Sequence, residues 1–196
     1  YPYEGDFDNQ SINSYYNGKK LGEIWGYETK GLAQSNEEMT SWLEKNKPNW
    51  GSNWQAGDVM YKDRNDDNKV TSGAGTLKDH GDLKRIGNST PRYNFGINLN
   101  AEWKGIDFSV FFQGVMKCDW YPGQGQPYFW GAIGDLWQST CFKEHLDYWS
   151  ENNKNAYYPK PYLNGDAQKN QQTQTRYLQS AAYMRCKNIQ LGYTLP

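Results

Sequence analysis

The 196-residue sequence predicts a mainly β fold, built from antiparallel strands with long loops and one short helix. Two observations predict the strands, because apolar and polar residues alternate along 93–115 and again, with one change of phase, along 183–193. The third observation is composition: aromatic residues make up 16% of the chain, a richness that disordered sequences lack. An ordered chain with a β core is therefore expected.

Charge and cysteine content narrow the class of protein. The formal net charge of -1 leaves no basic excess to neutralise phosphates, which argues against a nucleic-acid partner. No apolar run approaches the length of a helix that spans a membrane. The sequence opens without the pattern of a signal peptide and ends as abruptly, so we expect both ends to be cut from a longer protein. Three cysteines allow one intramolecular pair at most; Cys118 and Cys141 either pair or remain thiols.

The stretch "SNEEMTSWLEKN" predicts a short amphipathic helix over 36–46. Ser35 and Glu38 have the spacing of a capping box, in which each side chain satisfies a free backbone N–H at the start of the helix. Met39, Trp42 and Leu43 then fall on one face.

The stretch "RYNFGINLNAEWKGIDFSVFFQGV" predicts a β-hairpin. Its apolar residues fall at alternate positions: Tyr93, Phe95, Ile97, Leu99, Ala101 and Trp103, then Ile106, Phe108, Val110 and Phe112. Lys104 and Gly105 form a two-residue turn between the arms, and Phe111 alone interrupts the polar face of the second arm.

The length of these arms fits a membrane as well as a soluble sheet. About ten residues suffice for a tilted strand to cross a bilayer, and aromatic residues near the ends are typical of the two interfaces. A soluble sandwich would also bury one face, so the pattern leaves both open. The polar side chains suit a water-filled lumen or a solvent-facing sheet: Asn94, Asn98, Asn100 and Glu102.

A further strand is expected in "AAYMRCKNIQLGYTLP". Met184 and Cys186 share one parity, whereas Ile189, Leu191 and Tyr193 share the other. A bulge or strand boundary near 187–188 would restore one continuous apolar face.

Five blocks of the sequence resemble, in order, the C-terminal part of SusC/RagA-type TonB-dependent outer-membrane transporters. They are "GKKLGEIWGYETKGL", "GDVMYKDRNDDNKV", "GDLKRIGNSTPRYNFGINLNAEWKGIDFSVFFQGV", "LDYWSENNKNAYYPKPY" and "TRYLQSAAYMRCKNIQLGYTLP". The resemblance implies a plugged β-barrel of about 22 strands that imports oligosaccharides or peptides. It also implies a SusD-like surface lipoprotein as a lid and energy from the TonB complex, engaged through an N-terminal box and plug domain that lie outside this sequence, as do the final strands.

The resemblance divides the chain by role. Residues 1–196 would supply barrel strands, with a calcium-loop-like insertion at 57–87 and a long extracellular loop region at 116–180. Long loops on a rigid scaffold carry function, and flat rings stack on sugar faces. The candidate binding residues, which could instead pack the loop against itself or against a lid protein, are Trp120, Tyr121, Tyr128, Phe129, Trp130, Trp137, Tyr148 and Trp149.

The stretch "YKDRNDDNKVTSG" is similar to an EF-type calcium loop that begins at Asp63. Asn68 replaces the usual glycine at the sixth position, and Ala74 replaces the acid at the twelfth. The resembling family often carries an acid shortly after the loop, and "TLKDHGD" supplies two. Either the loop binds a structural Ca²⁺ or it is a solvated turn of Asx residues. The candidate ligands are Asp63, Asn65, Asp67, Lys69, Asp79 and Asp82.

No catalytic signature is found. His80 and His145 belong to no recognisable metal pair or nucleophile motif, so no enzymatic activity is expected. Paired carboxylates of the glycosidase type are recognised by their separation in three dimensions and not by their spacing along the chain. We expect part of an outer-membrane importer, for glycans more than for peptides, with its loops at the extracellular face. The alternative is a soluble, calcium-stabilised extracellular β-module that binds carbohydrate through aromatic residues.

Overall fold

The computed structural model describes residues 10–195 and is mainly β. Two compact units can be distinguished. The first, called the loop unit, comprises residues 10–20, 24–86 and 121–178; the second, called the sheet unit, comprises residues 21–23, 87–120 and 179–195.

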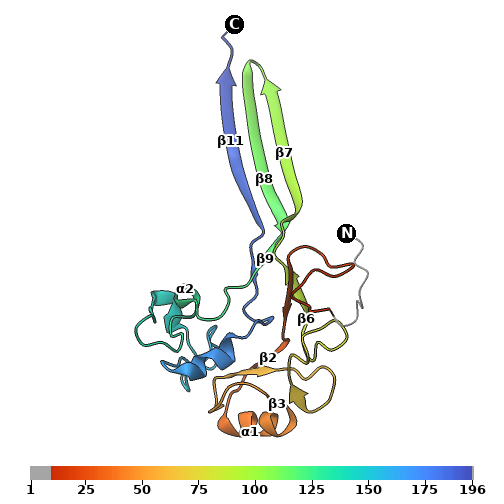
Figure 1. Ribbon diagram of the computed structural model, residues 1–196. Helices are drawn as coiled ribbons and strands as arrows, with labels where there is room; N and C mark the ends of the chain where they lie inside the picture. The colour runs from red at the N-terminus through yellow and green to blue at the C-terminus, as the bar shows by residue number, and fades with distance from the viewer. Residues whose placement is uncertain (1–9, 196) are drawn as a thin grey trace. The chain divides into compact units, whose positions relative to one another are not determined.

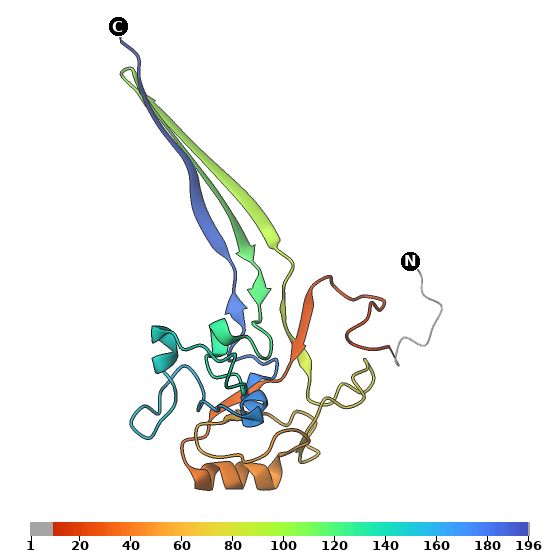
Figure 2. The ribbon, with the colours of Figure 1, turned by 60° about the vertical axis from the view of Figure 1, so that its left-hand side comes forward.

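The sheet unit is dominated by three long antiparallel strands in the order β11-β8-β7, which run side by side in Figures 1 and 2. Their bounds are Arg92–Trp103 for β7, Ile106–Lys117 for β8 and Tyr183–Tyr193 for β11. Two short strands, β9 (Asp119–Trp120) and β10 (Gln179–Ser180), form a second antiparallel pair.

The predicted hairpin is confirmed. Strands β7 and β8 are antiparallel: Trp103 is opposite Ile106 next to the turn, and Leu99 is opposite Val110 further along the strands. Both turn residues have positive φ, 47° at Lys104 and 83° at Gly105. Two consecutive positive values define the type I′ turn, whose twist matches that of the flanking strands.

The predicted change of phase in the last strand is a β-bulge. Cys186 lies opposite Phe112, the register then shifts, and Ile189 lies opposite Val110. The extra residue returns Ile189 and Leu191 to the face that Cys186 already occupies. One apolar face therefore extends across all three strands.

This apolar face is not covered by the described part of the chain. Leu99 is 54% exposed and Leu191 is 75% exposed, whereas Val110 on the central strand is 7% exposed because its neighbours flank it. On the opposite face, the ring of Phe111 lies over Gly96: a Cβ at Gly96 would be 3.1 Å from the ring. Phe111 interrupts the polar face because it fills this space.

The predicted helix is confirmed as α1, Asn36–Lys45, one residue shorter than expected at its end. The Ser35 hydroxyl accepts a hydrogen bond from the Glu38 backbone N–H at 3.2 Å. Met39 and Trp42 are buried, and the Trp42 indole donates to the Tyr61 carbonyl at 3.0 Å.

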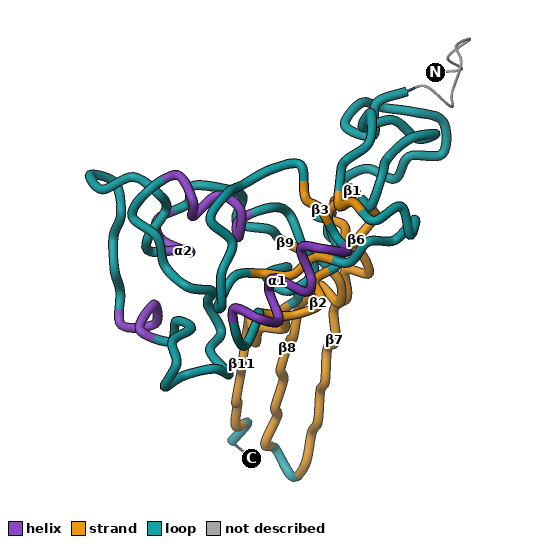
Figure 3. The backbone as a smooth tube through the Cα atoms, turned by 90° about the horizontal axis from the view of Figure 1, so that it is seen from below, coloured by secondary structure: helices purple, strands orange, loops and turns teal. Residues whose placement is uncertain are grey.

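Short strands and short helical segments complete the fold, and Figure 3 shows that loops make up most of the loop unit. Antiparallel pairing joins β2 (Thr29–Leu32) to β4 (Val59–Tyr61), and parallel pairing joins β3 (Lys47–Pro48) to β5 (Lys69–Val70). β1 (Glu23–Gly26) pairs with β6 (Lys84–Asn88). The short helical segments are α2 (Pro127–Trp130) and the 3₁₀ helices Lys143–Leu146 and Gly165–Gln171. Across residues 10–195, no helix has the length and apolar character needed to traverse a membrane.

Aromatic side chains form the core of the loop unit. Tyr61 and Tyr177 are fully buried. The rings of Tyr27, Trp50 and Tyr61 contact one another, with centroid distances of 4.8 Å from Tyr27 to Trp50, 5.5 Å from Tyr27 to Tyr61 and 5.6 Å from Trp50 to Tyr61. Burial raises the pKa of Tyr27 to about 12, because the phenolate would lose its hydration. The high aromatic content thus supplies the core that the polar composition otherwise lacks.

Candidate functional site

The structure separates the predicted aromatic residues into two groups. Trp130 and Trp149 lie in the core of the loop unit, and Tyr121 is partly buried with its hydroxyl donating to the Gln172 carbonyl at 2.6 Å. Phe129 packs against the same core. These four rings therefore pack within the loop unit, which is the alternative that the sequence left open, and a binding role for them stays a prediction. The remaining candidates, Trp120, Tyr128, Trp137 and Tyr148, are exposed.

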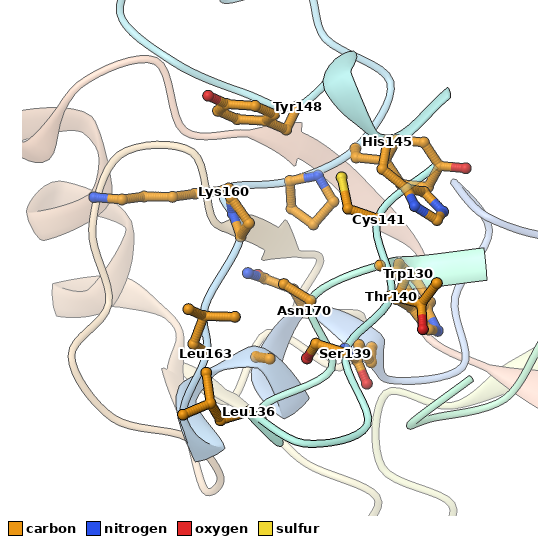
Figure 4. Close-up of a pocket in the computed structure, with 17 residues that line it drawn as sticks. Trp130, Leu136, Ser139, Thr140, Cys141, His145, Tyr148, Lys160, Leu163 and Asn170 are labelled. Atoms are coloured by element: carbon orange, nitrogen blue, oxygen red, sulfur yellow. The ribbon is translucent and has the colours of Figure 1, made fainter. Parts of the chain in front are cut away.

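A cavity of about 570 Å³ lies within the loop unit (Figure 4). Three segments form its wall, namely 130–148, 158–163 and 167–171. Trp130 and Tyr148 are the two lining residues that were predicted from sequence. The cavity was not expected, because residues distant in the sequence build it.

Apolar groups make up most of the wall. Leu136 and Leu163 lie together on one side of the cavity, with Tyr148 and His145 on the other (Figure 4). The Trp130 indole N–H donates to the Gly123 carbonyl at 2.7 Å, so its polar atom is already satisfied. The ring consequently contributes an apolar surface.

Polar lining groups are held mainly by the protein itself. The Ser139 hydroxyl donates to the Asp135 carbonyl at 2.6 Å and accepts from the Ile133 N–H at 3.2 Å. His145 Nδ1 accepts from the Phe142 N–H at 3.0 Å, which places the proton of the neutral ring on Nε2. No carboxylate side chain is among the described residues that line the cavity.

The Asn170 side chain connects this wall to a buried ion pair. Its Nδ2 donates to Asp58 Oδ1 at 2.9 Å, and its Oδ1 accepts from the Val59 N–H at 2.9 Å. Asp58 Oδ2 lies 2.9 Å from Lys169 Nζ, with both side chains fully buried. The cavity wall is therefore fixed to the segment that contains β4.

The predicted calcium loop is closed by its own hydrogen bonds. Asp63 accepts from the backbone N–H groups of Asp66 and Asn68, each at 2.8 Å. Asp67 accepts from the Lys69 N–H at 2.8 Å, and Asn65 accepts from the Asp67 N–H at 3.3 Å. These are the Asx turns of the alternative interpretation. Asn68 has a φ of 61°, the left-handed conformation expected where the usual glycine is missing.

The two candidate acids beyond the loop have different positions. Asp82 is fully buried and accepts from the Arg64 N–H at 2.7 Å and the Thr71 N–H at 2.8 Å, so it joins both ends of the loop. Asp79 instead accepts from the Ala74 N–H at 3.0 Å. Within residues 10–195, no three His, Cys, Asp or Glu side chains are grouped as a metal site. Calcium binding stays a prediction, because a calcium loop also uses amide and backbone oxygens.

The histidines and cysteines form no reactive group. The His80 ring lies 5.4 Å from the Trp25 ring, and His145 is bonded as described above. Cys118, Cys141 and Cys186 are all free thiols, so the structure does not contain the Cys118–Cys141 pair that the sequence left open.

The sequence of this chain is similar to those of TonB-dependent receptors. No family model matches the sequence. The chain is 25% identical over 194 residues to TonB-dependent receptor P3 of Formosa agariphila, covering 98% of this chain and 17% of that protein. It is 24% identical over 140 residues to TonB-dependent receptor P26 of the same organism, covering 71% of this chain and 13% of that protein.

A solved structure agrees with the fold. The structure of the RagAB peptide transporter matches 96% of this chain and 18% of that chain, with a TM-score of 0.55 and 22% identity. The predicted fold class, mainly β with antiparallel strands, is thereby confirmed. The resemblance to SusC/RagA-type transporters is likewise confirmed over nearly the whole chain. The similar proteins are receptors and a transporter rather than enzymes, and this chain spans less than a fifth of each.

Proposed function

We propose that the chain is part of an outer-membrane TonB-dependent importer, in which β7, β8 and β11 contribute to the barrel wall. The observation that carries this proposal is the continuous apolar face of the sheet unit, which the described chain leaves open. Large uncovered apolar patches mark surfaces that meet another apolar phase. In the importer that phase is the hydrocarbon of the bilayer.

The dimensions of the sheet support this assignment. The three strands have 12, 12 and 11 residues, and about 9–11 tilted residues cross a bilayer. Trp103 and Tyr193 are both opposite Ile106 on the apolar face at the turn end of the sheet, the position of an aromatic girdle in barrels. β7 and β11 are the edges of the described sheet, and neighbouring barrel strands would pair with them.

The opposite face of the sheet suits a water-filled lumen. Its cross-strand rows combine Asn100 with Ser109 and Gln190, and Glu102 with Asp107. Barrel strands alternate in this way between lipid and lumen.

Connection lengths support one orientation of the strands in the membrane. A two-residue turn joins β7 to β8, whereas the chain from 118 to 182 joins β8 to β11. Outer-membrane barrels have short turns on the periplasmic side and long loops outside. The predicted long loop region at 116–180 would therefore emerge at the cell surface.

The partners and substrate follow from the same proposal. A SusD-like lipoprotein would act as the lid, and the TonB complex would supply energy through other parts of the transporter. Oligosaccharides are the first substrate class, because exposed rings such as Tyr128 and Trp137 can stack on sugars. Peptides are the second, and the similarity to the RagAB peptide transporter favours them.

A soluble carbohydrate-binding module is less well supported. Such a module would bury the residues of one face in its own core, whereas Ile97, Leu99 and Phe108 are exposed. Leaving this face in water would make the module prone to association.

Uptake measurements test the proposal. Cells that express the whole transporter, either unchanged or with residues 116–180 shortened, would be given labelled oligosaccharides and labelled peptides. We expect import to be lost while the barrel still assembles in the outer membrane. Unchanged import of both substrates, or catalytic turnover by the isolated chain, would contradict the proposal.

A further inference from the structure

The cavity in the loop unit has the size of a ligand site. Its volume of about 570 Å³ falls within the roughly 300–1,000 Å³ of typical small-molecule pockets. Two of its lining residues, Leu136 and Leu163, remain 63% and 59% exposed to solvent. These two leucines offer apolar contact to a group that enters the cavity from solvent.

The cavity has no charge to offer an ionic ligand. Lys160 contributes to the wall, but its ammonium donates to Gln55 Oε1 at 2.8 Å and is directed away from the other lining side chains (Figure 4). Lys169 is sequestered by Asp58. Among the described lining residues there is also no acid.

A hydroxyl-rich sugar is poorly matched to this wall. Ser139 and Asn170 already use their polar atoms on partners within the chain, and apolar groups dominate the wall although Thr140, Tyr148 and Tyr158 also line it. A sugar entering here would lose water from several hydroxyls without equivalent replacement, and each unreplaced hydrogen bond weakens binding. The neutral His145 ring, with Nδ1 accepting from the Phe142 N–H, carries an Nε2–H donor that suits a carbonyl.

We infer that this cavity binds an uncharged apolar side chain, aromatic or branched aliphatic, carried by a peptide. The inference rests on the proposed function and selects the peptide from its two substrate classes for this site. The side chain packs against Leu136, Leu163 and Trp130, while His145 Nε2–H meets a backbone carbonyl of the same peptide.

Cys141 provides a direct reporter, because its exposed thiol lines the cavity. In the full chain, Cys118 and Cys186 are replaced by serine, so that Cys141 is the remaining thiol. The protein is placed in lipid nanodiscs, because detergent molecules could themselves bind in the apolar cavity. The rate of Cys141 alkylation by iodoacetamide is then measured with N-acetyl-L-phenylalaninamide or N-acetyl-L-leucinamide. At a probe concentration about ten times Kd, alkylation slows about tenfold.

Controls separate pocket binding from general effects. N-acetylglycinamide and maltotriose should leave the rate unchanged, and a chain that retains only Cys186, an exposed thiol on β11, should respond to none of the probes. Leu163→Asp should abolish the protection of Cys141. Leu146→Asp, at an exposed leucine outside the cavity, should preserve it.

Two results would overturn the inference: no protection by either apolar amide, whether or not n-octanol protects, or equal or greater protection by maltotriose. The assay does not depend on import. If the amides fail while shortening 116–180 still abolishes uptake, the inference falls and the importer stands. If the amides protect while uptake is unaffected, the cavity assignment stands and the proposed function falls.

Discussion

Lys169 and Asp58 form an ion pair of 2.9 Å in which both side chains are completely buried. The ammonium also donates to the carbonyls of Ser52 and Asn53, and its nitrogen lies 4.3 Å from the Tyr162 ring centroid. These contacts join two segments more than a hundred residues apart in the sequence. The pair therefore fixes the cavity wall to the rest of the loop unit.

Removal of one partner of this pair should destabilise the loop unit strongly. Lys169→Met leaves the Asp58 carboxylate buried without its cation, which costs about 3–5 kcal/mol. Urea unfolding followed by tryptophan fluorescence measures the loss. Lys154→Met, at an exposed lysine, is the matched control and should be neutral. Equal effects of the two variants would show that the pair adds no stability.

A charge on the apolar face of the sheet should block membrane assembly. Leu99→Lys places an ammonium toward lipid at a cost of about 2–4 kcal/mol near the bilayer midplane. Asn98→Lys, one residue earlier and on the polar face, should assemble normally. Heat-modifiable mobility of the whole transporter in outer-membrane fractions reports assembly. A soluble module would tolerate both substitutions, so normal behaviour of Leu99→Lys would count against the barrel.

The hairpin turn should resist substitution at Gly105. Its φ of 83° disfavours any side chain, and a Cβ there would lie 2.9 Å from the Thr194 carbonyl oxygen. Gly105→Val should cost about 1–3 kcal/mol and slow assembly of the sheet. Lys104→Asn tests the neighbouring position, where asparagine prefers the observed left-handed conformation, and should be neutral or stabilising. Assembly kinetics into lipid vesicles distinguish the two.

Ca²⁺ should protect the loop at 63–70 without being required for the fold. Ca²⁺ is expected to slow proteolysis of this loop, and Asp67→Asn should remove the effect, because a charged oxygen ligand is lost. Asp66→Asn removes a carboxylate from the same loop but not a candidate ligand, so protection should persist. An absence of Ca²⁺-dependent protection in the unchanged chain would leave the Asx turns as the whole explanation.

Alkali should destabilise the loop unit. Burial raises the pKa of Tyr27 to about 12, and it also raises the pKa values of Tyr121 and Tyr177. Above about pH 10 the unfolded chain ionises its tyrosines while the folded chain keeps them neutral, so stability falls as pH rises. Urea midpoints measured from pH 8 to 12, with tyrosinate absorbance, should show this decline. Tyr27→Phe should reduce it, whereas Tyr15→Phe, at an exposed tyrosine, should not.

The sequence by itself determined the elements whose signals are local. Alternation fixed the faces of β7 and β8, a Lys-Gly pair fixed their turn, and the change of parity near 187–188 placed the bulge. The cap at Ser35 fixed the start of α1. Each depends on neighbours within a few residues, because strand and helix periods are properties of the local backbone.

Only the tertiary structure decided which aromatic side chains are exposed to solvent and which residues surround the others. Trp149 and Trp137 lie in the same loop region, yet the first is 5% exposed and the second 92%. Composition cannot distinguish them, because burial depends on segments that meet only after folding. The same holds for Asp82, which was predicted as a possible ligand and which closes the base of the loop, and for the pairing of Asp58 with Lys169. Contacts between distant residues leave no periodic trace in a single sequence.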